Sequence, residues 1–265
     1  MNLRYLTLIT IGMLLFGANN PASAQPSGLL SSARQFLGTP YVGGTLEVND
    51  KEALVVNQEE VDCSTLVEYS LAHSICAQLG DTSSSAFRHH LQQIRYRQGI
   101  ISGYTSRLHY ATDWIYNGEQ AGYFRNITKE IGGTRLPLQL HYMSSHPQHY
   151  RHLDGNPREI AAIRAIEDSI NARTHYYIAK ENIPAVSAKI QDGDIIFFVT
   201  SIAGLDVSHM GIACRKGKTL TFVHASTRAK QVIVNPESLV AYCMNNKRTK
   251  GIIVCRPREI SILNK

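Results

Sequence analysis

The sequence lacks the features that mark several classes of protein. It has no internal repeat, no cysteine pair at CxxC spacing and no block of basic residues, and it holds a single tryptophan. Without CxxC spacing we expect no thiolate zinc site, and without a basic stripe or a known module we expect no nucleic-acid binding. The remaining composition, 43% hydrophobic and 18% charged over 265 residues, is that of a globular protein.

Long apolar runs are also missing, except at the start of the chain. Residues 6–16 are mostly apolar, follow the lone charge of Arg4 and precede the small residues Ala22-Ser23-Ala24. This pattern predicts a secretory signal peptide at residues 1–24, with an apolar part too short to span a membrane once it is cleaved. We expect residues 25–265 to form one exported, periplasmic domain, monomeric and without a stable membrane anchor.

The positive charge of the chain is mild and dispersed. The net charge is +6, and Arg88, Arg95, Arg97, Arg107 and Arg125 are separated by apolar and aromatic residues. Such a balance suits a polyanionic partner such as cell wall, and solubility alone explains it equally well.

Five cysteines are present, an odd number for an oxidising compartment. If Cys63 is a working thiol, Cys76, Cys214, Cys243 and Cys255 allow three disulfide pairings or none. The sequence does not choose among them.

The order of the elements predicts an α+β fold. Apolar residues at helical spacing predict helices at 29–37, at 63–79 and from Asn156-Pro157 through Ile170. Asp62 is placed to cap the second of these, and Gly80 ends it. Short β-rich runs then follow at 194–200, 210–214, 220–224, 232–234 and 252–256. Helices therefore come first and an antiparallel sheet follows.

Cys63 and two histidines carry the candidate chemistry. Cys63 begins the predicted helix at 63–79, where the helix dipole and a nearby imidazolium would lower its pKa and give a standing thiolate. Alternation in "VSHMGIAC" places His209 opposite the apolar Met210 and Ile212, and His224 lies on the next strand. Adjacent antiparallel strands would bring the imidazoles together, so that Cys63 is the nucleophile, His209 the base and His224 its orienting partner.

Five motifs carry a resemblance to a known family. "LGTPYVGG", "DCSTLV", "QDGDIIFF", "SHMGIA" and "FVHAS" occur in this order and resemble the NlpC-type, papain-like cell-wall cysteine hydrolases. The resemblance implies N-terminal helices packed on a C-terminal antiparallel sheet, with a large helical or loop insertion between the Cys and His motifs. It implies no cofactor and no metal.

A narrower resemblance concerns the substrate. "YVGGTLE", "RLHYATDWI", "ITKEIGG" and "YMSSHPQHY" are similar to an N-acetylmuramoyl-L-alanine amidase-like subfamily. That implies hydrolysis of the lactyl–L-alanine amide of muropeptides, with a 1,6-anhydro sugar expected, through a thioester on the enzyme. The resemblance places Tyr41 near the oxyanion, and we also expect Asp62, Ser64 and Ser208 to contact the substrate. The insertion, including residues 107–114, is the candidate surface for substrate selection, where Arg107 would pair with a stem-peptide carboxylate and Trp114 would stack on a sugar.

Two features depart from the wider family. Thr65 stands where its pattern usually has glycine, and a long interval separates Cys63 from His209. The resemblance also leaves open whether Asp62 is mainly a helix cap or a ligand of the substrate.

Three alternatives remain open at this point. A γ-D-glutamyl-diamino acid endopeptidase would use the same three residues, and a non-catalytic wall-binding protein would share only the fold. A zinc amidase would take its ligands from His141, His146, His149 and His152. The last three recur every third residue around Pro147, which does not match the i, i+4 spacing of HExxH.

Overall fold

The computed structural model describes residues 28–260, and the predicted signal peptide at 1–24 lies outside this range. Within it, eight strands form one sheet in the order β2-β3-β8-β4-β5-β6-β7, with β1 paired to β8. Every strand pairing in it is antiparallel. The strands are β1 (Phe124–Asn126), β2 (Thr134–Leu136), β3 (His175–Ala179), β4 (Ile195–Thr200), β5 (Val207–Lys216), β6 (Thr219–Ser226), β7 (Gln231–Val234) and β8 (Thr249–Pro257).

The helices precede the central strands or connect them. They are α1 (Gly28–Arg34), α2 (Cys63–Leu79), α3 (Ser84–Arg95), α4 (Ala111–Gln120), α5 (Thr128–Ile131), α6 (Tyr142–Ser145), α7 (Pro157–Asn171), α8 (Ile183–Val186) and α9 (Leu239–Asn245). Short 3-10 turns lie at η1 (Arg97–Gly99), η2 (Tyr104–Ser106), η3 (Pro147–His149), η4 (Lys180–Asn182) and η5 (Ser187–Lys189). This mixture of helices with an antiparallel sheet confirms the α+β class.

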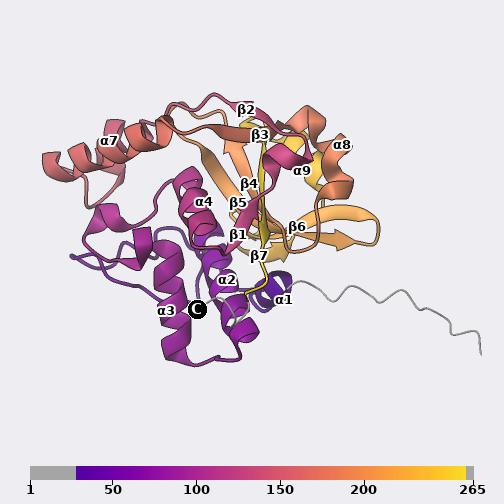
Figure 1. Ribbon diagram of the computed structural model, residues 1–265, viewed down its shortest axis with the longest axis horizontal. Helices are drawn as coiled ribbons and strands as arrows, with labels where there is room; N and C mark the ends of the chain where they lie inside the picture. The colour runs from indigo at the N-terminus through magenta and orange to yellow at the C-terminus, as the bar shows by residue number, and fades with distance from the viewer. Residues whose placement is uncertain (1–27, 261–265) are drawn as a thin grey trace, which may run out of the picture.

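The sheet is buried on both faces. Ile195 and Phe197 of β4 pack into one core cluster with α1–α4, whereas the alternate Ile196 and Phe198 pack into a second cluster with α5, α8 and α9. Figure 1 shows α1, α2 and α3 below the sheet, α4 at its left, and α8 and α9 at its upper right.

The surroundings of His209 add a second apolar face to the predicted one. The alternation along β5 is as predicted, since Met210, Ile212 and Cys214 pack into the first cluster on the face opposite to His209. Ala213, on the same face as His209, is buried in the second cluster. The alternation along β5 shows one apolar stripe in the sequence. It does not show that short helices cover the other face of the sheet.

Helices α1 and α2 also differ in detail from expectation. The first ends at Arg34, and Leu37, expected on its buried face, is 44% exposed. The second is buried nearly all round, including the polar Glu68 and Ser70, because it lies between α1, α3 and β5 and not on the surface as an amphipathic helix would.

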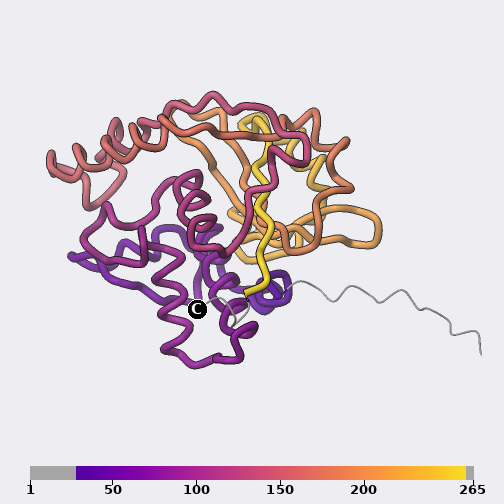
Figure 2. The backbone as a smooth tube through the Cα atoms, viewed as in Figure 1, coloured from indigo at the N-terminus to yellow at the C-terminus, as the bar shows by residue number. Residues whose placement is uncertain are grey.

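The interval between the Cys and His motifs folds onto the same body. It contributes α3, α4, β1–β3 and α5–α8, and a third apolar cluster joins η2, α6 and α7. In Figures 1 and 2 the later part of this interval, from β2 through α7 to β3, runs above α1, α2 and α3, with α7 at the left edge. The insertion therefore builds one side of the molecule.

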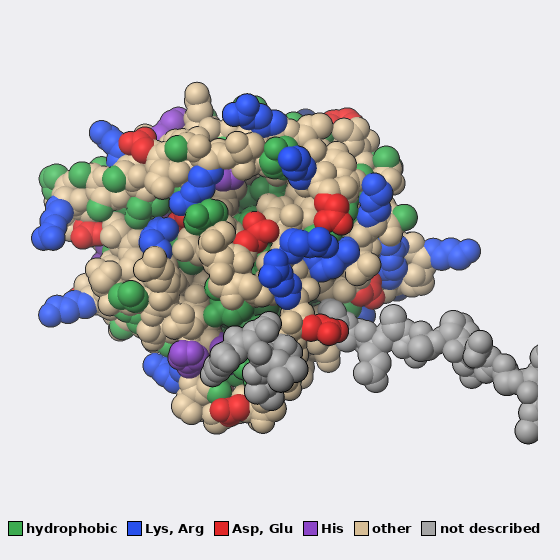
Figure 3. Space-filling model, in the orientation of Figure 1, with side chains coloured by type: hydrophobic (Ala, Val, Ile, Leu, Met, Phe, Trp, Pro, Cys, Tyr) green, Lys and Arg blue, Asp and Glu red, His purple; other side chains and the backbone are tan. Residues whose placement is uncertain are grey.

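Other global expectations can be compared with residues 28–260. In that range no helix is long and apolar enough to cross a membrane. The five cysteines are all free, with Cys63 half-buried and the other four buried. Figure 3 shows Lys and Arg spread over the visible face among Asp and Glu, as the dispersed sequence positions indicate.

Candidate active site

The start of α2 fixes the backbone of Cys63. Asp62 is the N-cap, and its carboxylate accepts hydrogen bonds from the N–H of Ser64 at 3.0 Å and of Thr65 at 2.8 Å. The Thr65 hydroxyl accepts in return from the N–H of Asp62 at 2.9 Å, which completes a capping box. Asp62 is thus a helix cap, and the departure from glycine at position 65 supplies the second half of that cap.

Tyr41 is held beside this helix start by backbone pairing. It forms a parallel bridge with Val61, and its N–H donates to the carbonyl oxygen of Lys230 at 2.9 Å. Burial, and then the nearby Cys63 and Asp62, raise the pKa of Tyr41. The phenol therefore stays protonated and can donate a hydrogen bond close to the sulfur.

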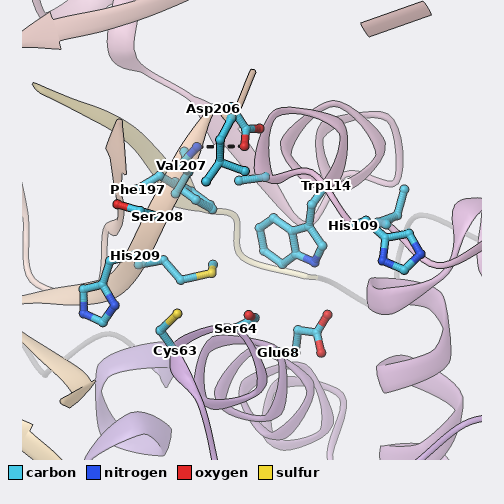
Figure 4. Close-up of a pocket in the computed structure, with 14 residues that line it drawn as sticks. Cys63, Ser64, Glu68, His109, Trp114, Phe197, Asp206, Val207, Ser208 and His209 are labelled. Carbon is cyan, nitrogen blue, oxygen red and sulfur yellow. Dashed lines mark hydrogen bonds between the residues drawn. The ribbon is translucent and has the colours of Figure 1, made fainter. Parts of the chain in front are cut away.

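The two strand histidines meet as predicted. Nε2 of His209 and Nδ1 of His224 are 2.7 Å apart, and the rings are nearly perpendicular at 79°. His209 stacks on Phe198, and His224 packs against Phe222 on the same face of β6. In Figure 4 the His209 ring and the Cys63 sulfur lie at the same end of the site, from β5 and α2.

Burial, however, keeps these groups neutral. It raises the pKa of Cys63 to about 12, with the Asp62 carboxylate adding to the effect and the N–H of Met210 opposing it. Burial, and then His224, lower the pKa of His209 to about 3, and burial lowers that of His224 to about 4. Desolvation at this site therefore opposes the standing thiolate expected at the helix start.

Cys63, Ser208 and His209 stand between two hollows. On one side is an inner cavity of about 190 Å³, which Ser64, Glu68, His109 and Trp114 also line. On the other side is an open groove of about 820 Å³, lined also by Tyr41, His224, Arg228, Asn235 and Arg248. The thiol is thus accessible from both hollows.

The inner cavity faces an edge of Trp114. The ring stacks on Phe124 at 4.9 Å and packs against Phe197, and the residue is only 5% exposed. Its Nε1 is buried without a hydrogen-bond partner. Figure 4 shows this nitrogen and the Glu68 carboxylate pointing into the cavity from opposite walls. We therefore revise the predicted stacking role of Trp114 to that of an edge donor.

Asp206 holds α4, and with it Trp114, against the start of β5. Its carboxylate accepts from the N–H and hydroxyl of Thr112 at 2.7 and 2.8 Å and from the N–H of Val207 at 2.7 Å. The insertion segment predicted to select substrate does line the cavity, through Leu108, His109, Ala111 and Trp114.

Arg107 is not a free cation of the site. It is 6% exposed, and its guanidinium pairs with Glu47 at 2.5 Å and Glu52 at 3.3 Å. Its expected bond to a stem-peptide carboxylate is corrected on this ground, because carboxylates of the chain already occupy it.

The sequence reasoning missed several lining residues. Glu68 lies one turn after Ser64 on α2, a spacing that could have indicated it. Arg228 is in the β6–β7 hairpin loop, close in sequence to His224, and Arg248 precedes β8. Tyr242, whose ring lies 6.0 Å from His224, comes from α9, which no motif marked.

None of the four histidines considered for zinc lines the cavity or the groove. His141 lines a separate depression. His146 stacks on Tyr142 and His149, and His152 stacks on Tyr104. In residues 28–260 no group of three or more His, Cys, Asp or Glu is placed to hold a metal ion.

The thiol lies at a helix start, beside one imidazole that a second histidine orients. This arrangement is suited to nucleophilic hydrolysis. The comparison with family models agrees with this class, since residues 31–252 match the AmiA-like model, described as N-acetylmuramoyl-L-alanine amidase-like. The chain belongs to this amidase-like hydrolase family.

Several solved structures are similar to this chain over most of its length. An N-acetylmuramoyl-L-alanine amidase from Bacteroides uniformis is 44% identical with a TM-score of 0.84, over 87% of this chain and 98% of that one. A Bacteroides fragilis protein named as a xylanase is 41% identical with a TM-score of 0.82, over 86% and 99%. A Legionella pneumophila protein, 20% identical with a TM-score of 0.66 over 87% and 88%, shows the fold alone. No curated protein matches the chain.

Proposed function

We propose that the protein is an exported cysteine amidase that hydrolyses the N-acetylmuramoyl-L-alanine bond of peptidoglycan fragments. The observation that carries this proposal is the pair of imidazoles 2.7 Å apart in the groove that Cys63 also lines. Family membership and the 44% identity to an amidase of this name support the choice of bond. The helix-borne thiol against an antiparallel sheet supports a papain-like ancestry.

The reaction begins with proton transfer within the Cys63–His209 pair. Burial opposes a lone charge on either group, but a thiolate and an imidazolium formed together offset each other's charge. The sulfur attacks the lactyl carbonyl as the proton moves to His209, and a tetrahedral oxyanion forms. His209 then gives this proton to the alanine nitrogen, the C–N bond breaks, and a thioester remains on Cys63. His209 next takes a proton from water, whose oxygen attacks the thioester carbonyl. The C–S bond then breaks, the lactyl carboxylic acid leaves, and the proton on His209 returns to the sulfur to restore the thiol.

The oxyanion is assigned to the N–H of Cys63 and the hydroxyl of Tyr41. The first is a free donor of the first turn of α2, and the second lines the groove beside the sulfur. Because one oxyanion donor is worth roughly 3 to 4 kcal/mol, we expect Tyr41→Phe to lower kcat about 100-fold or more. A loss below about threefold, measured by steady-state kinetics, would remove Tyr41 from this role.

The inner cavity suits the acyl side of the bond. Trp114 Nε1 offers a donor and Glu68 an acceptor on facing walls, and Leu108, Ala111 and Phe197 supply apolar surface. An acetamido group of the sugar has the complementary carbonyl oxygen, N–H and methyl group. The expected preference for a 1,6-anhydro sugar would depend on contacts beyond this cavity.

The groove suits the stem peptide. Once the lactyl carboxyl is consumed in the amide, the carboxylates of such a muropeptide all lie on its peptide. Arg228 and Arg248 are exposed, line the groove and have no ion pair among residues 28–260. They take over the role first expected of Arg107.

A glycosidase reading, suggested by the xylanase name, fits the carboxylates poorly. Glycoside hydrolysis uses two carboxyl groups across one sugar. The carboxylates lining the inner cavity are Glu68, paired with Arg95 at 2.8 Å, and Asp206, which accepts from Thr112 and Val207.

The test is mass spectrometry of a defined disaccharide–tetrapeptide after incubation with the mature protein, with Cys63→Ala as the matched control. We expect intact disaccharide and a peptide beginning with L-alanine from the wild type alone. A cut after D-glutamate would instead make the protein an endopeptidase. Equal cleavage by Cys63→Ala would refute the nucleophile, and xylan serves as the control substrate for the glycosidase reading.

Two further expectations remain proposals. We place the enzyme in the periplasm on the strength of the predicted signal peptide, and we expect a monomer. Fractionation of cells and sizing of the mature protein test them.

A further inference from the structure

The contact between the two histidines raises the question of which ring nitrogen carries each proton. One N–H is shared between His209 Nε2 and His224 Nδ1 across 2.7 Å. His209 therefore has only Nδ1 left for Cys63, and this atom accepts the thiol proton only if the ring proton lies on Nε2. His224 must then accept at Nδ1 and hold its own proton on Nε2.

That proton on His224 has no partner in the structure as it stands. Nε2 of His224 is buried without a hydrogen bond, and the residue is 3% exposed. A buried N–H without an acceptor is unfavourable, because it has given up its hydrogen bond to water and gained none in return. The opposite tautomer would turn the shared hydrogen bond round and leave His209 without a lone pair toward the sulfur. Something near Nε2 must favour the productive form.

Asn235 is the polar side chain that the sheet register brings to this position. His224 pairs with Ile233, and the N–H of Asn235 donates to Phe222 at 2.8 Å, so that Asn235 is the diagonal neighbour of His224 on the same face. Asn235 and His224 line the same groove. The Asn235 side chain also opposes the lowering of the His224 pKa by burial.

The orientation of the Asn235 amide is fixed from the other side. Its Nδ2 donates to the carbonyl oxygen of Glu237 at 2.9 Å, and the Thr221 hydroxyl donates to the carbonyl oxygens of both Asn235 and Glu237 at 2.8 Å. Nδ2 is thereby engaged, and Oδ1 is the amide atom free to accept. Asn235 is 7% exposed, so water competes little for it.

We propose that Oδ1 of Asn235 accepts the Nε2–H of His224 and so holds both imidazoles in the tautomers that leave His209 Nδ1 as the base. Asn235 is then a positioning residue, acting on Cys63 through two rings and touching no substrate. The inference rests on the proposed function only in that it assigns the base to His209.

The isosteric variants Asn235→Asp and Asn235→Leu separate this role from a structural one. Both lose the donor to Glu237, so a purely structural role predicts the same defect in both. Asp keeps an acceptor and adds a charge that raises the pKa of His224. We expect its kcat/KM to approach the wild-type value at high pH and to fall at neutral pH, with the acidic limb shifted upward.

Asn235→Leu should instead lower kcat at least tenfold at every pH, with KM within about twofold of wild type. The pH profiles of activity must be compared with the titration of the groups that face the histidine pair. These groups are Cys63 from α2, Tyr242 from α9, and Glu237, Arg228 and Arg248 in the groove.

A second readout needs no substrate. In ¹⁵N-histidine spectra of the folded protein, Nε2 of His224 should be the protonated nitrogen in the wild type and in Asn235→Asp at high pH, but not uniformly in Asn235→Leu. The same tautomer populations in all three proteins would overturn the proposal, as would identical pH profiles of the two variants. Because the spectra are independent of turnover, failure of the amidase assignment would be seen separately.

Discussion

The arginines on the two sides of Cys63 differ in how their charge is neutralised. On the inner side Arg95 and Arg107 are buried and paired with Glu68, Glu47 and Glu52. On the groove side Arg228 and Arg248 are exposed and line an open hollow. The first set holds helices and loops together, whereas the second is the set that we propose binds the peptide. Residue type alone does not separate the two roles, but the presence of a partner carboxylate does.

The largest effect should come from breaking the inner pair. Arg95→Met leaves Glu68 buried without its partner, and loss of one member of a buried pair is destabilising by about 3–5 kcal/mol. We expect a correspondingly lower free energy of unfolding in urea titrations.

The double variant Arg95→Met, Glu68→Leu sharpens this test. Stability should recover in large part because no charge is left buried. Activity should not recover, since the Glu68 carboxylate lines the inner cavity. Recovery of both would show that Glu68 takes no part in binding.

The buried histidines should give a pH dependence of intermediate size. The pKa of His209 is lowered from 6.5 to about 3 and that of His224 to about 4. The unfolded chain therefore binds more protons below about pH 6.5, and the free energy of unfolding should fall as the pH drops from there. The slope is about 1.4 kcal/mol per pH unit for each proton. His224→Gln should lose its share of the slope in denaturation curves at pH 7 and 5.

The smallest effect concerns the groove. Arg228→Ala and Arg248→Ala should each raise KM for a tetrapeptide-bearing substrate about tenfold, or about 1.4 kcal/mol, with little change in stability. Lys247→Ala, an exposed cation outside the groove, is the matched control. A substrate with amidated carboxyl groups should abolish the difference. Equal KM values for all variants would move the peptide elsewhere.

Sequence reasoning went furthest where a contact is local or follows from alternation. The Asp62 cap needs only its neighbours, and the meeting of His209 and His224 follows from two adjacent strands. It failed for Arg107 and Trp114 because distant segments contribute to their surroundings and supply Glu47 and Phe197. The predicted lowering of the Cys63 pKa failed for the same reason, since burial is a property of the assembled fold.

The capping box at the start of α2 has a consequence for how reactivity is acquired. The backbone around Cys63 is set by contacts at most three residues apart, whereas its base arrives on strands more than a hundred positions later. A partly folded chain can thus shape the backbone around Cys63 well before the two histidines reach it. Under the proposed mechanism, hydrolysis then requires that the β5–β6 hairpin has docked, and a molecule cleaved before β5 would carry the thiol as an ordinary cysteine.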